Sequence, residues 1–267
     1  MIGAVLPVYN EEAIVGAVIK CFKPFTDKFI VLISEKPWLG ETEPPDRTEE
    51  ICQELDVDIV KSDWKEYHLQ RNFGNKLCSD CDLIFTLDSD ELMVPQEIEK
   101  LIKFAETTEY RAIGVLPEVY WKDIDHIFKP KSTFEPIMLI RPEVRFLKYR
   151  NVDCPYTVCG AEMHHLAWSD LRNMKQKVKS WGHADSYTKE TGEKWYNEHY
   201  LKWKDGDKAI DLLGNIGDVV RSPLPKELRD RLGVVKVNGV RIGIKNLITN
   251  LIGDGFIEIK HNDHVSR

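Results

Sequence analysis

The first 116 residues alternate short apolar runs with segments of helical periodicity, and this alternation restricts the folds that the chain can adopt. The apolar runs are rich in β-branched residues, which favour strands, whereas the segments between them repeat apolar residues at helical spacing. Parallel strands need crossover connections, so the pattern predicts an α/β, Rossmann-like fold with a mostly parallel sheet flanked by helices. The expected strands are 2–8, 29–33, 58–60, 83–87 and 111–116, and the expected helices are 13–21, 47–55, 69–77 and 95–106.

Polar residues follow three of the expected strands. They lie at positions 10–12 after the first strand, 34–35 at the end of the second and 88–91 after the fourth. Sheets of this kind bind ligands outside the carboxyl ends of their strands. The sequence therefore predicts a ligand site built from these three segments.

The strongest local signal is the acidic segment TLDSDE at 86–91. Asp88 and Asp90, one residue apart at a strand end, can share a divalent cation with a bound diphosphate. Mg²⁺ and Mn²⁺ prefer carboxylate oxygens and keep ligand positions for phosphates. The alternative is structural, because Asp90 and its acidic neighbours would also favour the first turn of the following helix.

The charge and the hydropathy pattern limit the environment and the partners. A net charge of −7 argues against a general polyanion binder, which needs a basic face. No apolar run approaches the roughly 20 residues that span a bilayer. Residues 1–9 lack the basic start and cleavage site of a secretory signal. A cytoplasmic location is therefore expected.

Four of the six cysteines form two closely spaced pairs. Cys78 and Cys81 are spaced C-x2-C, and Cys154 and Cys159 are spaced C-x4-C, so the four thiolates could hold zinc. Ordinary buried thiols are the expected alternative, because Cys78 lies where a helix leads into a strand.

Four motifs resemble those of family 2 glycosyltransferases of the GT-A fold. The segment VLPVYNEE at 5–12 is similar to the opening strand and loop, and DRTEEI at 46–51 resembles the D-G-T helix start. QRNFGN at 70–75 resembles the A-R-N-x-G helix, and DLIFTLDSD at 82–90 resembles the strand that ends in the D-x-D motif. The motifs occur in the order of the family, and the resemblance implies a glycosyltransferase of the hexosyltransferase type.

The resemblance also implies a donor site in the first half of the chain. Pro7, Tyr9 and Glu11 would line the pocket for the nucleotide base and ribose. The D-D-G-S turn, whose aspartate reads the base in the family, is replaced here by a Pro-rich loop. Glu35 is the expected substitute, and uridine is the default base.

The same resemblance implies roles for three charged residues. Arg71 would approach the diphosphate or the base, Asp88 would contact the nucleotide, and Asp90 would ligate the metal. Chemistry supports the role of Arg71, because a planar guanidinium donates two hydrogen bonds to phosphate oxygens. A solvent-facing helix residue is the alternative for Arg71.

Candidates for the remaining roles lie in the segment GAEMHHLAW at 160–168, which is similar to an acceptor-side segment of some relatives. Glu162 is the expected general base, and His164 and His165 could complete the metal site. Trp168 is the expected platform for sugar stacking. Lysines at 175, 177 and 179 either face solvent or hold diphosphate.

The sequence therefore predicts a Mn²⁺- or Mg²⁺-dependent inverting transfer from a nucleotide sugar, UDP-linked by default. The acceptor is open between a glycan, a lipid-linked sugar, a protein and a modified nucleobase. A nucleotidyltransferase is one alternative, although the loop after the first strand has no glycine or basic residue; a non-catalytic sugar-nucleotide binding protein is another. The expected organisation is a domain at 1–205, with a nucleotide-sugar half at 1–118 and an acceptor half at 119–205, and a C-terminal extension of unknown role at 206–267.

Secondary structure beyond residue 119 is expected to be less regular. Short strands are expected at 138–140 and 144–147, helices at 171–182 and 194–204, and strand-like alternation at 234–244.

Overall fold

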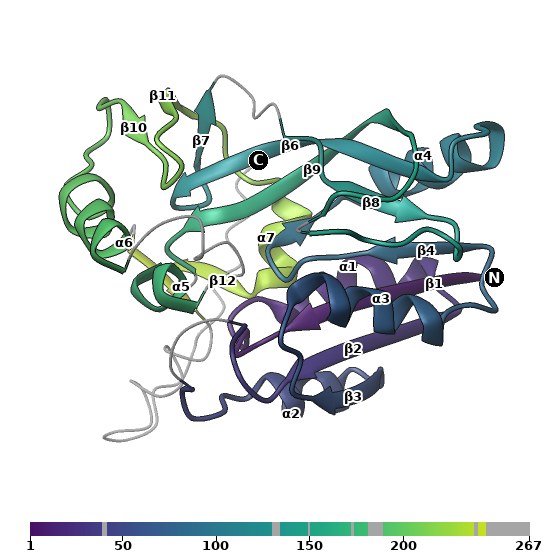
Figure 1. Ribbon diagram of the computed structural model, residues 1–267. Coiled ribbons are helices and arrows are strands. Elements are labelled where there is room, and N and C mark those ends of the chain that lie inside the picture. The colour runs from purple at the N-terminus through teal and green to yellow at the C-terminus, as the bar shows by residue number, and fades with distance from the viewer. Residues whose placement is uncertain are drawn as a thin grey trace, which may run out of the picture.

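A computed structural model shows the arrangement of the chain (Figure 1). It describes residues 1–38, 42–129, 134–148, 150–171, 174–180, 189–237 and 240–243. Helices and strands alternate through the first half, so the predicted α/β class is confirmed. Among the described helices, none has the length and apolar character needed to cross a bilayer.

Four parallel strands form the first half of the main sheet, in the order β3-β2-β1-β4. Every expected strand of this region is present, within one or two residues of its expected ends. The strands are β1 (Ile2–Val8), β2 (Lys28–Ser34), β3 (Asp58–Ser62) and β4 (Leu83–Thr86). The connecting elements are α1 (Val15–Phe22), the 3-10 turn η1 (Lys23–Phe25), α2 (Thr48–Glu54) and α3 (Tyr67–Leu77).

Helices cover both faces of these strands because the strand side chains alternate in direction. In β1, Ala4 and Leu6 belong to a core that includes α1, α2, α4 (Pro95–Thr107) and α7 (Lys226–Leu232). Val5 belongs to the core on the opposite face, beneath α3. Burial on both faces explains why the apolar runs of the first strands are continuous.

The second half of the sheet mixes directions. β8 (Ile137–Ile140) runs antiparallel between β4 and β6 (Ala112–Lys122). The sheet then continues through β7 (His126–Lys129), β11 (Ile216–Arg221) and β10 (Ala209–Ile210). The segment from 206 onward thus adds two strands to the sheet edge, and its helix α7 packs against α1.

The strand β9 (Tyr156–Ser169) is the longest in the described chain and was not expected from the sequence. It pairs in parallel with β6, and the two-residue strand β5 (Glu91–Leu92) pairs with it in antiparallel fashion. Glu91 lies opposite His165, and Leu92 lies opposite His164. This pairing brings the acidic segment after β4 alongside the histidines.

The elements after β9 surround an aromatic core. They are α5 (Met174–Ser180), α6 (Lys189–Trp195) and the π-helical turn η3 (Tyr196–Tyr200). Later in the chain, β12 (Val234–Val237) and β13 (Val240–Gly243) form a separate two-stranded hairpin. The ring of Trp121 packs against Trp195 and Tyr200 with centroids 6.2 and 5.6 Å apart. The expected alternation near 234–244 is confirmed over the described residues. The expected helix at 171–182 is confirmed over 174–180, with 172, 173, 181 and 182 outside the described residues.

Two expected elements differ from the structure. The expected helix at 194–204 begins earlier, at Lys189, and its last turns are π-helical up to Tyr200. The expected strand at 144–147 is wrong, because Phe146 makes only one isolated bridge, with Val152. Instead, the Asn72 side chain accepts from the Phe146 backbone N–H at 2.8 Å and donates to its C=O at 2.7 Å. An amide side chain thus takes the place of a partner strand.

The cysteines lie in two different cores. Cys78 and Cys81 are buried on the α3 face with Cys154 at the margin, whereas Cys159 belongs to the core on the other face. Burial raises the pKa of the Cys78 thiol to about 12. No group of three or more His, Cys, Asp or Glu side chains placed to hold a metal occurs in the described part of the chain. Three of the four cysteines are buried and Cys154 is half-buried, and their division between two cores favours separate thiols over one zinc site.

Gly74 sets the distance between α3 and the sheet, and we expect Gly74→Ala to destabilise the protein. A Cβ at this position would lie 2.3 Å from Val5 Cγ1 and 2.9 Å from Leu32 Cδ1. Helix propensity alone would favour alanine by about 1 kcal/mol, whereas overpacking costs about 1–3 kcal/mol. Thermal unfolding should show a lower midpoint.

Gly160→Ala is the matched control for Gly74→Ala, because its only near neighbour would be Lys100 Nζ at 4.0 Å. Its unfolding midpoint should stay close to that of the wild type. An unchanged or raised midpoint for Gly74→Ala would contradict the tight packing of α3.

Candidate functional site

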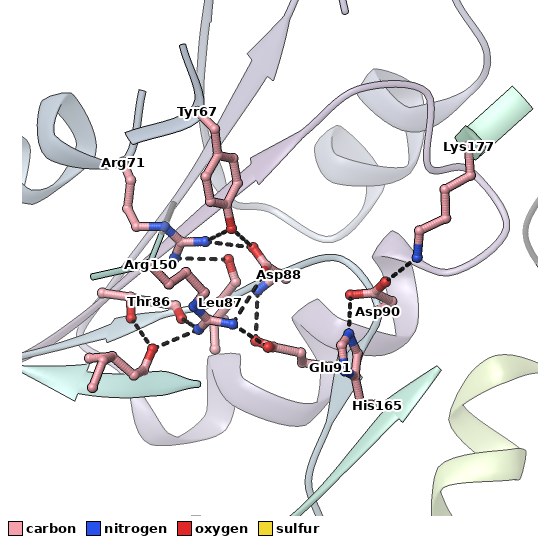
Figure 2. Close-up of polar contacts among 11 residues, drawn as sticks. Tyr67, Arg71, Thr86, Leu87, Asp88, Asp90, Glu91, Arg150, His165 and Lys177 are labelled. Carbon is pink, nitrogen blue, oxygen red and sulfur yellow. Dashed lines mark hydrogen bonds and ion pairs between the residues drawn. The ribbon is translucent and has the colours of Figure 1, made fainter. Parts of the chain in front are cut away.

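Asp88 lies just beyond the carboxyl end of β4, and cationic side chains hold both of its oxygens (Figure 2). Oδ1 accepts from Arg71 Nη2 at 2.5 Å and from the Tyr67 hydroxyl. Oδ2 accepts from Arg150 Nη1 at 3.0 Å. Arg71 and Tyr67 come from one face of α3, four residues apart, whereas Arg150 comes from the loop before β9.

Arg150 is buried and joins three elements. Its guanidinium donates to the buried Glu91 carboxylate, to the Thr86 carbonyl at 2.7 Å and to the Ile137 carbonyl at 2.6 Å. Thr86 ends β4, Ile137 starts β8 and Glu91 belongs to β5. Glu91 also accepts from the backbone N–H of Asp88 at 3.0 Å, which fixes the turn between the two acids.

Burial and ion pairing set the protonation of this cluster. Burial alone would raise the pKa of Asp88, but Arg150 and Arg71 outweigh it and hold that pKa below its ordinary value. Burial raises the pKa of Glu91 in spite of the Arg150 charge. For Arg150, burial opposes the charged form, but Glu91 and Asp88 raise its pKa. Asp88 is therefore an anion at neutral pH.

Asp90 belongs to a separate group of contacts (Figure 2). Its Oδ2 accepts from Lys177 Nζ at 3.1 Å, and its Oδ1 lies 3.4 Å from His165 Nε2. Lys177 also donates to the Ala167 carbonyl at 2.7 Å. The β5–β9 pairing positions His165, and α5 supplies Lys177. The two acids of the D-x-D motif thus have different partners.

Glu162 and His164 form a third group. His164 Nε2 lies 3.7 Å from Glu162 Oε1, and His164 Nδ1 lies 3.2 Å from the Tyr120 hydroxyl. Successive strand residues face opposite sides, so His165 contacts Asp90 while His164 contacts Tyr120 and Glu162. The Glu162 side chain is 46% exposed, which leaves its carboxylate accessible.

The expected base and ribose residues lie on β1, β2 and the loops that follow them. Pro7 pairs with Leu32 inside the sheet. The Tyr9 hydroxyl accepts from the Glu43 backbone N–H at 2.8 Å. Loops from β1 and β2 therefore meet at this end of the sheet.

Glu11 and Glu35 use their backbones to connect neighbouring segments. The Glu11 backbone N–H donates to Thr48 Oγ1 at 2.7 Å, and the Glu35 backbone N–H donates to the Ser62 carbonyl at 3.0 Å. Asn10, directly before Glu11, takes a positive φ of 50°, which the αL-tolerant asparagine permits. The roles of Pro7, Tyr9, Glu11 and Glu35 toward a nucleotide remain predictions.

Trp168 is buried in the aromatic core. Its ring packs against Trp195 with centroids 5.4 Å apart, and Lys177 Nζ lies 5.2 Å from the ring. Stacking of a sugar on this residue stays a prediction. Trp38, by contrast, reaches the Asp88 cluster: it packs edge-on against Tyr67 at 5.1 Å and donates to Gln70 Oε1 at 2.9 Å.

Asp88 and the Asp90–His165 pair differ in how well they could bind a divalent cation. Asp88 fits poorly, because two guanidinium groups and a hydroxyl hold its oxygens. Asp90 and His165 offer one carboxylate and one imidazole close together. Mn²⁺ would accept such a pair when substrate phosphates supply further ligands, whereas Mg²⁺ prefers oxygen ligands. The ammonium of Lys177 stands where a cation would contact Asp90.

Sequence reasoning missed Arg150 and the role of Tyr67, and left Lys177 open. Tyr67 could have been found from its position four residues before Arg71 on one helix face. Arg150 carries no such signal, because its partners are distant in sequence and two of them are backbone carbonyls.

Comparisons with known proteins bear on the family and the fold. A profile described as "Glycosyl transferase family 2" matches residues 4–166, more than half of the chain. No curated protein matches the chain in sequence. The crystal structure of S. aureus TarS is similar at 13% identity and TM-score 0.44, covering 62% of this chain and 36% of TarS.

Two further structures are similar at the same remote level. TarS 1–349 in complex with UDP-GlcNAc has 14% identity and TM-score 0.35, with 45% of this chain and 35% of that chain covered. A mycobacterial protein has 14% identity and TM-score 0.45, with 84% of each chain covered. At TM-scores this low, these likenesses carry no argument about function.

We expect Arg150→Met to cause a large loss of stability. The substitution removes the cation from two carboxylates, one fully buried, and uncompensated buried charge costs about 3–5 kcal/mol. Urea unfolding should show a correspondingly lower free energy of unfolding. Arg145→Met is the control, because that exposed pair with Asp153 is worth about 0–1 kcal/mol. Equal effects of the two substitutions would refute the organising role of Arg150.

Proposed function

This chain belongs to glycosyl transferase family 2, and on that premise we propose that it carries out metal-dependent, inverting sugar transfer. The donor is a nucleoside-diphosphate sugar, with uridine as the default base, and the acceptor is a hydroxyl group. The proposal rests chiefly on one observation: Asp90 and His165 lie 3.4 Å apart beside the Asp88 cluster, at the carboxyl end of β4.

The charge balance of the site supports a requirement for a cation. Among the side chains that the structure describes, three cations and three anions are ion-paired at the carboxyl end of β4: Arg71, Arg150, Lys177, Asp88, Asp90 and Glu91. These six side chains neutralise one another, so they leave little net positive charge for the diphosphate of a donor. A divalent cation held by Asp90 and His165 would supply the positive charge that the diphosphate needs.

In the proposed reaction, Asp90 and His165 would hold the cation, which would supply positive charge to offset the departing diphosphate. Arg71 and Arg150 keep Asp88 ionised and fix its direction. The Asp88 side chain is 25% exposed, so its carboxylate can accept a hydrogen bond from the nucleotide. Tyr67, which donates to Asp88, and Trp38, which packs against Tyr67, would limit the water around the bound nucleotide.

Glu162 is the proposed general base. Its exposed carboxylate would take the proton from the acceptor hydroxyl as the oxygen forms its bond to the anomeric carbon. The bond from that carbon to the diphosphate breaks, and the configuration inverts without a covalent enzyme intermediate. His164, which contacts the Tyr120 hydroxyl, lies with its Nε2 3.7 Å from the Glu162 carboxylate. A glycan, a lipid-linked sugar, a protein and a modified nucleobase remain the candidate acceptors.

Loss of the Asp90 carboxylate should remove donor turnover. We expect Asp90→Asn to lower nucleoside diphosphate release from a panel of nucleotide sugars with Mn²⁺ by at least about 100-fold, since comparable electrostatic groups contribute 10²–10³. Excess chelator should suppress wild-type release in the same way. Asp218→Asn, in an exposed pair with Lys208, is the control and should remain active.

Two results would contradict this proposal. Wild-type rates for Asp90→Asn, or full turnover in chelator, would exclude the cation scheme. Pyrophosphate as the released product would instead indicate a nucleotidyltransferase.

The role of Glu162 predicts a separation between binding and chemistry. Glu162→Gln should lower kcat by about 10²–10⁴, the usual share of general base catalysis, and leave the affinity for the nucleotide unchanged. The rate would be followed by nucleoside diphosphate release, and the affinity by calorimetry with the nucleotide. Glu99→Gln on the exposed side of α4 is the control. A wild-type kcat for Glu162→Gln would show that another residue is the general base.

A further inference from the structure

Lys177 is a buried ammonium in contact with the acid that the proposed function gives to the cation. The Lys177 and Asp90 side chains are only 6% and 7% exposed, and Nζ lies 3.1 Å from Oδ2. Burying an ammonium is costly unless a partner compensates it. Asp90 and the Ala167 carbonyl supply that compensation. The pair is therefore a built feature of the site rather than a surface contact.

An ammonium and a divalent cation exclude each other at this carboxylate. Asp90 offers Oδ2 to Lys177 and Oδ1 to the side of His165. A divalent ion ligated by Asp90 would lie within a few ångströms of Nζ, and like charges at that distance in a buried site repel strongly. Entry of the ion therefore requires Lys177 to leave.

Among the cations described at the carboxyl end of β4, Lys177 is better suited to move than Arg71 or Arg150. Arg150 is fixed by backbone carbonyls of two strands, and Arg71 packs between the rings of Tyr67 and Phe146. Lys177 carries its charge on one ammonium at the end of a flexible four-carbon chain. Unlike an arginine, it can change direction without breaking a planar pair of hydrogen bonds.

We propose that Lys177 and the divalent cation exchange at Asp90. Without donor, Lys177 neutralises Asp90 and weakens the binding of the cation there. When the cation arrives, it takes the carboxylate, and Lys177 turns to the diphosphate. The displaced ammonium then lies beside the diphosphate and stabilises its negative charge. Lys177 thus weakens metal binding and strengthens donor binding. This inference rests on the proposed function.

The exchange predicts opposite effects of one substitution on two affinities. Lys177→Met should bind Mn²⁺ at least about tenfold more tightly than the wild type in the absence of nucleotide, because the competing charge is gone. The same variant should bind UDP about tenfold more weakly in saturating Mn²⁺, because a charge-assisted bond to phosphate is lost. Mn²⁺ binding is measured by electron paramagnetic resonance of the unbound ion, and UDP binding by calorimetry.

Two further variants serve as controls. Lys177→Arg keeps the charge and should keep the weak Mn²⁺ affinity of the wild type. Lys194→Met removes an exposed lysine of the neighbouring helix α6 and should change neither affinity. Circular dichroism and thermal unfolding check that each variant is folded.

The wild-type protein gives a second measurement that does not depend on a variant. Mn²⁺ alone should increase the labelling of Lys177 by an amine-acetylating reagent, read by mass spectrometry, and UDP should reverse the increase. Labelling of Lys194 should be the same in all conditions.

The outcomes separate this inference from the proposed function. Equal Mn²⁺ affinity of Lys177→Met and wild type, in proteins that turn over donor with Mn²⁺, would overturn the exchange alone. Absence of Mn²⁺ binding in every variant, with or without UDP, and turnover that survives chelator would overturn both. In that case Lys177 would be the permanent counter-ion of Asp90.

Discussion

The buried guanidinium of Arg150 is the interaction on which the site depends. It binds carbonyls at the end of β4 and the start of β8, and it pairs with Glu91 on β5 and with Asp88. A buried charge with this many partners fixes the relative positions of these segments, because each lost hydrogen bond would leave a buried polar group unpaired. The parallel and the mixed parts of the sheet are therefore tied together at the place where the acidic segment turns.

The turn after β4 gives the two acids of one short motif different functions. Asp88 faces the arginines, whereas Asp90 faces β9 and α5, so one carboxylate is held ionised and directed while the other meets a histidine and a lysine. A similar division separates His164 from His165 on β9. On β9, the alternation of strand side chains separates the two adjacent histidines, whereas the turn at Ser89 and Asp90 separates the two acids.

The sequence predicted features that depend on local interactions better than features that depend on contacts between distant parts of the chain. Elements of the parallel half were predictable, because apolar periodicity and short crossovers are local signals. The segment at 144–147 was mistaken for a strand, because Asn72 satisfies the backbone of Phe146 from another part of the chain. Strand β9 contains polar residues and glycine, and its pairing with β6 decides its conformation. Local propensity carries no information about such partners.

The sequence by itself determined the α/β class, the order of the first strands and helices, and the family, since these depend on periodicity and on short contiguous motifs. It also supplied Asp88, Asp90 and Arg71 as one group. Only the tertiary structure decided that Arg150 and Tyr67 hold Asp88 and that Lys177 and His165 hold Asp90. Those pairings join residues far apart in the chain, and burial of their charges requires complementary partners that the fold alone brings together.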